Sequence, residues 1–126
     1  MGDPQRQDVG ARTKSYAVRV IGLYSSLPKT VVAQVIGKQV LRSGTSVGAH
    51  YREARRAKSD ADFINKIETG LQELDETIYW LELLIDAEIV RKDELRDLLR
   101  ETEELIAMFV TMVKKVKARK KIQVKG

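Results

Sequence analysis

Apolar side chains recur along most of this chain at alternating spacings of three and four residues, the period of an amphipathic helix. The pattern is cleanest between residues 60 and 87. There the apolar positions are Ile64, Ile67, Leu71, Leu74, Ile78, Leu81 and Ile85. Because such a stripe must be covered by other helices, it predicts one helix of a helical bundle.

Three further segments repeat this period, at residues 11–26, 30–58 and 92–118. Thr30 and Ser59 precede two of the four segments and are predicted to be their N-caps. The connections are short, so the fold class is predicted to be all-α, an antiparallel up-down four-helix bundle. Residues 11–118 then form the bundle, between a flexible N-terminus at residues 1–10 and a basic C-terminal tail at residues 119–126.

The segment 30–58 carries Gly44 and Gly48 within its helical pattern. A glycine in a helix interior costs about 1 kcal/mol relative to alanine. Two such costs at adjacent turns predict that another backbone approaches closely there, or that the helix is kinked. The alternative is a loop that divides this segment into two helices.

The length of 126 residues fits one domain, and the chain contains no cysteine. No segment approaches the run of about 20 apolar residues that a membrane span needs, and no secretory signal is recognisable. We therefore expect a cytoplasmic protein with no membrane partner.

Charge is distributed in three blocks along the chain. Residues 1–58 hold 11 Lys and Arg against three acids, residues 59–109 hold five against 15, and residues 110–126 hold seven against none. The formal net charge is +5. Blocks of this kind pair within a bundle or between subunits, lie on solvated helix faces, or form a surface for an anionic polymer.

Two dense clusters of cations favour nucleic acid, RNA or DNA, as a partner. Antiparallel helices would bring the two clusters to one end of the bundle, where they would bind phosphates without reading sequence. The predicted nucleic-acid-binding residues are Arg52, Arg55, Arg56, Lys58, Lys114, Lys115, Lys117, Arg119, Lys120 and Lys121.

No residue pattern supports catalysis, a cofactor or a metal, so we expect a non-enzymatic protein. His50 is the only histidine, too few for a di-iron bundle or a histidine zinc site. Arg42 and His50 are separated by seven residues, whereas some helical-bundle ribonucleases separate these residue types by four to six. The stretch from Ser43 to Gly48 lacks the lysine of a phosphate-binding loop.

His50 and Glu53 are instead predicted to be structural polar residues. Glu53 is surrounded by arginines in the sequence, which is typical of an ion network on a helix face. We favour the alternative that Glu53 points inward and pairs with His50 or with another helix, because a buried carboxylate needs such a partner.

Tyr79, Trp80 and Leu83 lie off the main apolar stripe of the segment 60–87. Large apolar side chains on an outer helix face are usual at interfaces. They predict a homo-oligomer, with partial burial under the first helix as the alternative.

Two sequence blocks resemble the bacterial four helix bundle protein family, first noticed as reading frames in intervening sequences of large-subunit ribosomal RNA genes. The blocks are Arg42–Ala54 and Ala61–Leu83, and the likeness extends over about residues 16–116. One departure is His50, where the family commonly has asparagine.

This resemblance implies an antiparallel four-helix bundle and, as in relatives, a homopentamer. A related branch comprises accessory proteins of diversity-generating retroelements, which bind nucleic acid and a reverse transcriptase. The sequence therefore predicts a non-enzymatic, oligomeric bundle that binds nucleic acid or serves a reverse transcriptase through basic surfaces. The alternative is a structural or protein-interaction module with no nucleic-acid role.

Overall fold

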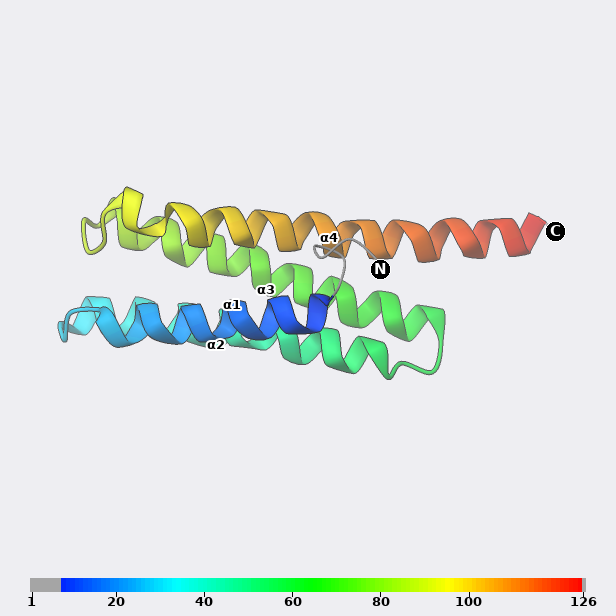
Figure 1. The fold of residues 1–126 in the computed structure, drawn as a ribbon, viewed down its shortest axis with the longest axis horizontal. Coiled ribbons are helices and arrows are strands. Elements are labelled where there is room, and N and C mark those ends of the chain that lie inside the picture. The colour runs from blue at the N-terminus through cyan, green and yellow to red at the C-terminus, as the bar shows by residue number, and fades with distance from the viewer. Residues whose placement is uncertain (1–7, 126) are drawn as a thin grey trace.

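The protein, seen here in a computed structural model, consists of four helices arranged side by side (Figure 1). The structure describes residues 8–125, with side chains as far as Arg119. The helices are α1 (Val9–Ser26), α2 (Val31–Arg55), α3 (Asp60–Asp86) and α4 (Lys92–Lys125). No strand occurs among the described residues, so the prediction of an all-α four-helix bundle is confirmed.

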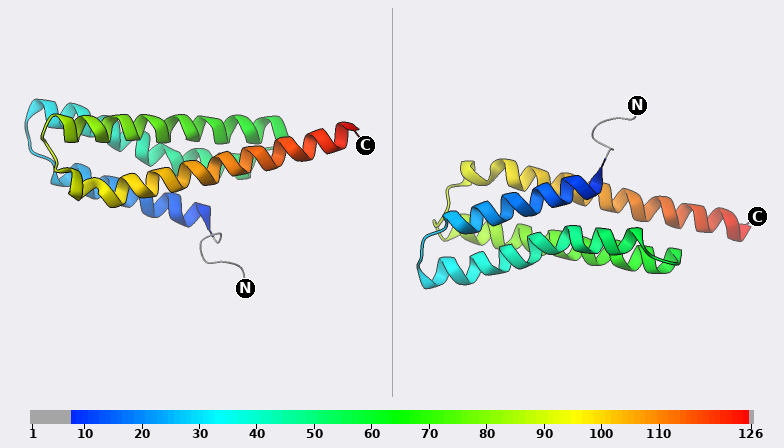
Figure 2. Two further views of the ribbon diagram at one scale, coloured as in Figure 1. Left: turned by 90° about the horizontal axis from the view of Figure 1, so that it is seen from above. Right: turned by 60° about the horizontal axis from the view of Figure 1, so that its bottom comes forward.

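Successive helices run in opposite directions, and each packs mainly on its neighbours in the chain (Figure 2). The α2–α3 contact is the most extensive, whereas α1 touches α4 at few points. The helices also differ in length, since α1 has 18 residues and α4 has 34. The last turns of α2, the start of α3 and the end of α4 therefore extend past the start of α1 (Figure 1).

The helix ends follow from side-chain capping. The Thr30 hydroxyl accepts a hydrogen bond from the Ala33 amide, and the Ser59 hydroxyl accepts one from the Asp62 amide. Both predicted N-caps are therefore confirmed. A third cap, Asp8, accepts from the Ala11 amide at 2.9 Å, which begins α1 at Val9 rather than at residue 11.

Three predicted boundaries need correction. Residues 9 and 10 of the predicted flexible N-terminus belong to α1, while residues 1–7 lie outside the described part. The second helix ends at Arg55 rather than at residue 58, where Ala57 bonds back to the Ala54 carbonyl and the chain turns toward Ser59. The fourth helix continues through the predicted tail to Lys125, because residues 119–125 contain no glycine or proline to stop it.

The core is one continuous layer of side chains from all four helices. Its largest fully buried members include Tyr16 of α1, Val47 of α2, Leu74 of α3 and Phe109 of α4. Their burial is the main source of stability, because each apolar side chain removed from water contributes about 1.5–3 kcal/mol before entropy is counted.

The two glycines in α2 mark close contact with α1. A Cβ at Gly44 would lie 2.8 Å from Cγ2 of Val20, and one at Gly48 would lie 3.1 Å from Oγ1 of Thr13. The helix α2 runs through both positions without a break. The predicted close approach of another backbone is therefore confirmed, and the alternative of an intervening loop is wrong.

Two polar contacts fasten α1 to α4 where apolar contact is sparse. Arg12 forms a fork with Glu101, at 2.6 and 3.1 Å, and reaches Glu104 at 3.0 Å. The hydrogen bond to Glu101 raises the pKa of Arg12 above its ordinary value. One turn further on, the Tyr16 hydroxyl lies 2.6 Å from Oγ1 of Thr102 in the core.

Burial raises the pKa of Tyr16 from 10.0 to about 12. The folded state thus favours the neutral phenol over the charged phenolate. The resulting contribution to the free energy of unfolding is complete below pH 10 and is lost as the pH rises toward 12. We expect wild type to lose about 1 kcal/mol more stability than Tyr16→Phe between pH 8 and pH 11. Urea unfolding of both proteins at the two pH values measures this difference, and equal losses would contradict the burial of the phenol.

Candidate nucleic-acid interface

The C-terminal ends of α2 and α4 lie at the same end of the bundle (Figure 1). Arg52, Arg55, Arg56 and Lys58, the cations at the end of α2, are all exposed. None of these four forms an ion pair with another described residue. Their charges are therefore available to a partner.

The second predicted cluster, on α4, is partly neutralised by α3. Lys117 lies 3.8 Å from Glu68, and Arg119 lies 3.3 Å from Asp60. Lys114 and Lys115 are exposed, and neither pairs with a described acid. The side chains of Lys120 and Lys121 lie outside the described part of the structure. Among the described residues, the end of α2 therefore has four exposed cations without an acidic partner, and this part of α4 has two.

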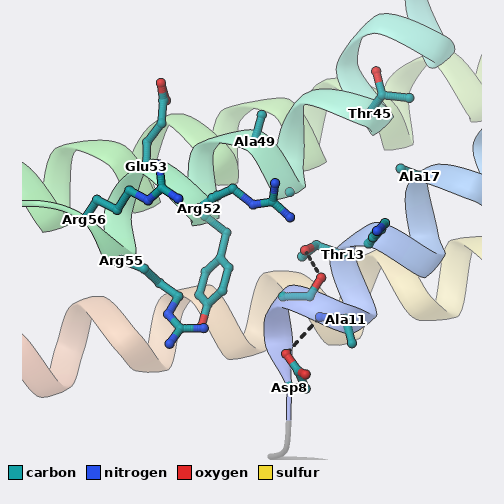
Figure 3. A pocket seen from close by; sticks show the side chains of 14 residues that line it. Asp8, Ala11, Thr13, Ala17, Thr45, Ala49, Arg52, Glu53, Arg55 and Arg56 are labelled. Atoms are coloured by element: carbon teal, nitrogen blue, oxygen red, sulfur yellow. Dashed lines mark hydrogen bonds between the residues drawn. The ribbon is translucent and has the colours of Figure 1, made fainter.

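The end of α2 borders a groove of about 740 Å³ between α1 and α2, here called the α1–α2 groove (Figure 3). Its residues come from the start of α1 and the second half of α2. They are Asp8, Gly10, Ala11, Thr13, Lys14, Ala17, Thr45, Gly48, Ala49, Tyr51, Arg52, Glu53, Arg55 and Arg56. Three of the predicted nucleic-acid-binding residues therefore share one concave surface.

The groove exists because its floor is built from small side chains. Ala17 on α1 and Thr45 and Gly48 on α2 leave space where larger residues would fill the contact between the helices. The contact of Gly48 with Thr13 closes the bottom. Figure 3 shows Ala17 pointing toward α2 and the Arg52 side chain extending over the gap.

Lys14 and Tyr51 are members of this site that the sequence does not predict. Lys14 is an exposed residue of α1, and only the antiparallel packing of α1 on α2 places it beside the arginines. Tyr51 lines the groove, and the centre of its ring is 6.0 Å from that of Phe109. The close approach marked by Gly48 was the only sequence signal that these two helices meet here.

The two acids at the groove are both engaged elsewhere. Asp8 caps α1. Glu53 lies with its Oε1 3.3 Å from Nδ1 of His50, and Figure 3 shows its side chain directed away from the gap. The groove thus carries four cations, Lys14 and the three arginines, against these two carboxylates, so its lining is positively charged overall.

His50 bridges two helices through its ring nitrogens. Nδ1 faces Glu53, and Nε2 lies 3.5 Å from Glu73 of α3. The Glu73 side chain is 13% exposed and that of Glu53 is 53% exposed. His50 and Glu53 thus pair as predicted, but Glu53 does not point inward, and the sheltered acid is Glu73. Among the described residues, no group of three or more His, Cys, Asp and Glu side chains is placed to hold a metal ion.

The predicted interface residues Tyr79, Trp80 and Leu83 differ in burial. Tyr79 is 55% exposed, and its ring packs edge-on against Trp80. Trp80 and Leu83 are half-buried. The main contacts of α3 are with α2 and α4. The role of Tyr79, Trp80 and Leu83 at a subunit interface stays a prediction.

The fold and the cationic α1–α2 groove define a small helical-bundle protein with a basic concave surface. A model of the 23S rRNA-intervening sequence protein family matches residues 5–111. The chain belongs to this family, and the predicted resemblance is confirmed.

The fold is also similar to a crystal structure of a protein of unknown function, from the S23 ribosomal protein family of Bacteroides thetaiotaomicron. The two sequences are 40% identical, and the TM-score is 0.79. The match covers 84% of this chain and 98% of the other. No protein with a curated description matches the chain. Within the described residues, no helix has the length and apolarity to cross a membrane.

Proposed function

We propose that this protein is a non-enzymatic nucleic-acid-binding protein whose cationic surface contacts phosphate backbones with little sequence preference. The observation that carries this proposal is the set of unpaired, exposed cations at the end of α2, joined by Lys14 across the α1–α2 groove. Phosphate contacts of Lys and Arg give most of the affinity of such proteins and are independent of base sequence.

The family description supports RNA as the first ligand to examine, since it refers to an intervening sequence of 23S rRNA. The proposal implies a cytoplasmic protein, where RNA and DNA are both present. A reverse transcriptase is a further proposed partner, supported only by the resemblance to retroelement accessory proteins.

We also propose that the protein acts as a homo-oligomer, with a pentamer as the state that the family resemblance implies. The hydrogen bond between Ser43 and Thr77 sets the register of α2 on α3 and puts Trp80 at the level of Val40. The exposed side chains Val32, Val35 and Tyr79 lie on the same pair of helices toward the α1–α2 turn. Large apolar side chains exposed on a helix surface are often found at interfaces. Sedimentation equilibrium gives the mass, and a monomer at all concentrations would contradict this proposal.

The nucleic-acid proposal is tested by removing charge from the end of α2. In the triple variant Arg55→Gln, Arg56→Gln and Lys58→Gln, we expect at least a tenfold loss of affinity for RNA near 100 mM salt. The slope of log affinity against log salt should become shallower by about 2–3, because each phosphate contact contributes about 0.7–0.9. Fluorescence anisotropy with a labelled oligonucleotide measures both.

The matched control is the triple variant Lys29→Gln, Lys38→Gln and Lys92→Gln. It removes the same charge from exposed residues away from the basic end. We expect less than a threefold change in affinity. Equal losses in the two triple variants would show a general effect of net charge and contradict the proposed surface. Absence of binding to both RNA and DNA at low salt would favour the alternative, a protein-interaction module.

A further inference from the structure

We propose that the α1–α2 groove is a binding site for single-stranded nucleic acid, in which phosphates contact the arginines of α2 and one or two bases enter the gap. This inference rests on the proposed function. It places nucleic-acid binding in a particular groove rather than anywhere on the charged surface. It concerns RNA and DNA equally, because both present the same backbone phosphates and bases with flat faces.

The shape of the groove excludes a duplex from its interior. Packed helices lie about 8–10 Å apart, and here the Gly48–Thr13 contact brings α1 and α2 together at the floor. The DNA major groove alone is about 12 Å wide, so a duplex is far broader than the space between two such helices. A single strand has no such width, and a volume of about 740 Å³ is within the range that holds small ligands.

The cations are arranged along one wall rather than scattered. Arg52 lies in the last turn of α2 and Arg56 is the C-cap of that helix, so the two are four residues apart, about 6 Å along the helix axis. Neighbouring phosphates in a stacked strand rise by about 3.4 Å each, so this wall spans about two nucleotides. Lys14 supplies a positive charge from the opposite helix. A strand in the groove would therefore meet cations on both sides.

The floor suits bases, because it is free of charge. Ala17, Thr45, Gly48 and Ala49 form a surface of small side chains, and Tyr51 contributes an aromatic ring. Stacking of a base on an aromatic side chain stabilises single-strand complexes by about 1–3 kcal/mol and tolerates any base. Tyr51 is held in place by its contact with Phe109, so the ring does not have to be ordered on binding.

The test fills the groove without changing its charge. Ala17→Leu and Thr45→Leu place bulk in the gap from opposite walls, and Ser15→Leu adds the same bulk to an exposed position of α1 outside the groove. We measure anisotropy with labelled 12-nucleotide single strands of RNA and DNA and with hairpin duplexes of matched sequence. Thermal unfolding followed by circular dichroism confirms that each variant is folded.

We expect wild type to prefer either single strand over the duplex by at least fivefold. Each filling variant should weaken single-strand binding at least fivefold and change duplex binding by less than twofold. The Ser15→Leu control should bind both the single strands and the duplexes within twofold of wild type. Binding that is equal for single strand and duplex, and unaffected by the filling variants, would overturn the groove site while leaving the proposed function intact. No binding of any oligonucleotide by wild type would overturn both.

A second measurement uses the wild-type protein alone, so it is independent of any effect on folding. Lys14 lies in the groove, whereas Lys29 lies in the turn between α1 and α2. Saturating single-stranded oligonucleotide should slow acetylation of Lys14 at least threefold and leave Lys29 unchanged, as measured by mass spectrometry. Equal acetylation of Lys14 with and without the oligonucleotide would overturn the groove site.

Discussion

Phe109→Ala is expected to lower the free energy of unfolding by about 3–5 kcal/mol. The Phe109 ring is completely buried and fills the space between α4, Gly70 of α3 and Tyr51 of α2. A Cβ at Gly70 would lie only 2.7 Å from Cε2 of the ring, so the ring and the glycine fit each other. Removing the ring leaves a cavity that the surrounding helices cannot easily close, which adds to the lost hydrophobic burial.

Urea unfolding of wild type and Phe109→Ala measures this loss. Because small domains are stable by only about 5–15 kcal/mol, the variant should be near its unfolding midpoint at modest urea concentrations. Glu103→Ala, an exposed change on the same helix, is the control and should cost less than about 0.5 kcal/mol. A loss below about 1 kcal/mol for Phe109→Ala would contradict the packing of α4 described above.

Gly44→Ala is expected to destabilise the protein by about 1–3 kcal/mol, although alanine is the better helix former. The added methyl group would lie 2.8 and 3.0 Å from the two Cγ atoms of Val20. Valine has essentially one side-chain rotamer available in a helix, so Val20 cannot turn aside and the helices must separate. The cost of that separation exceeds the gain of about 1 kcal/mol from helix propensity.

Gly22→Ala is the matched variant, and it is expected to change the stability in the opposite direction. Gly22 also lies in a helix interior, but nothing is within 4 Å of a Cβ built there. We therefore expect a stabilisation of about 0.5–1 kcal/mol from reduced freedom of the unfolded chain. Thermal melts of both variants measure the pair. If both substitutions stabilise, then α1 and α2 are not in close contact at Gly44.

These two glycine positions show how much of the fold was readable from the chain. Both interrupt a helical pattern, and propensity assigns both the same cost. Only the register of α1 on α2 makes Gly44 essential to packing and leaves Gly22 open to solvent. The end of α4 is a similar case. The absence of a core pattern after residue 118 predicts a tail, whereas the helix-compatible sequence there continues as helix to Lys125.

The candidate site also depends on contacts between helices, which the sequence does not reveal. The arginines at positions 52, 55 and 56 were recognised as a cluster because they are neighbours in the sequence. Lys14 and Tyr51 were not recognised, because their membership depends on a contact between two helices. In the predicted α4 cluster, the local sequence gives no sign that Glu68 and Asp60 lie beside Lys117 and Arg119.

The sequence by itself determined the number of helices, two of their N-caps and their up-down order, because period, capping residues and short connections are local properties. It also determined the family, because two blocks of residues carry that likeness. Only the tertiary structure decided which cations lack an acidic partner and where a groove lies between the helices. Those features arise from side chains far apart in the chain, brought together by the unequal lengths of α1 and α4 and by the close packing of α2 on α1.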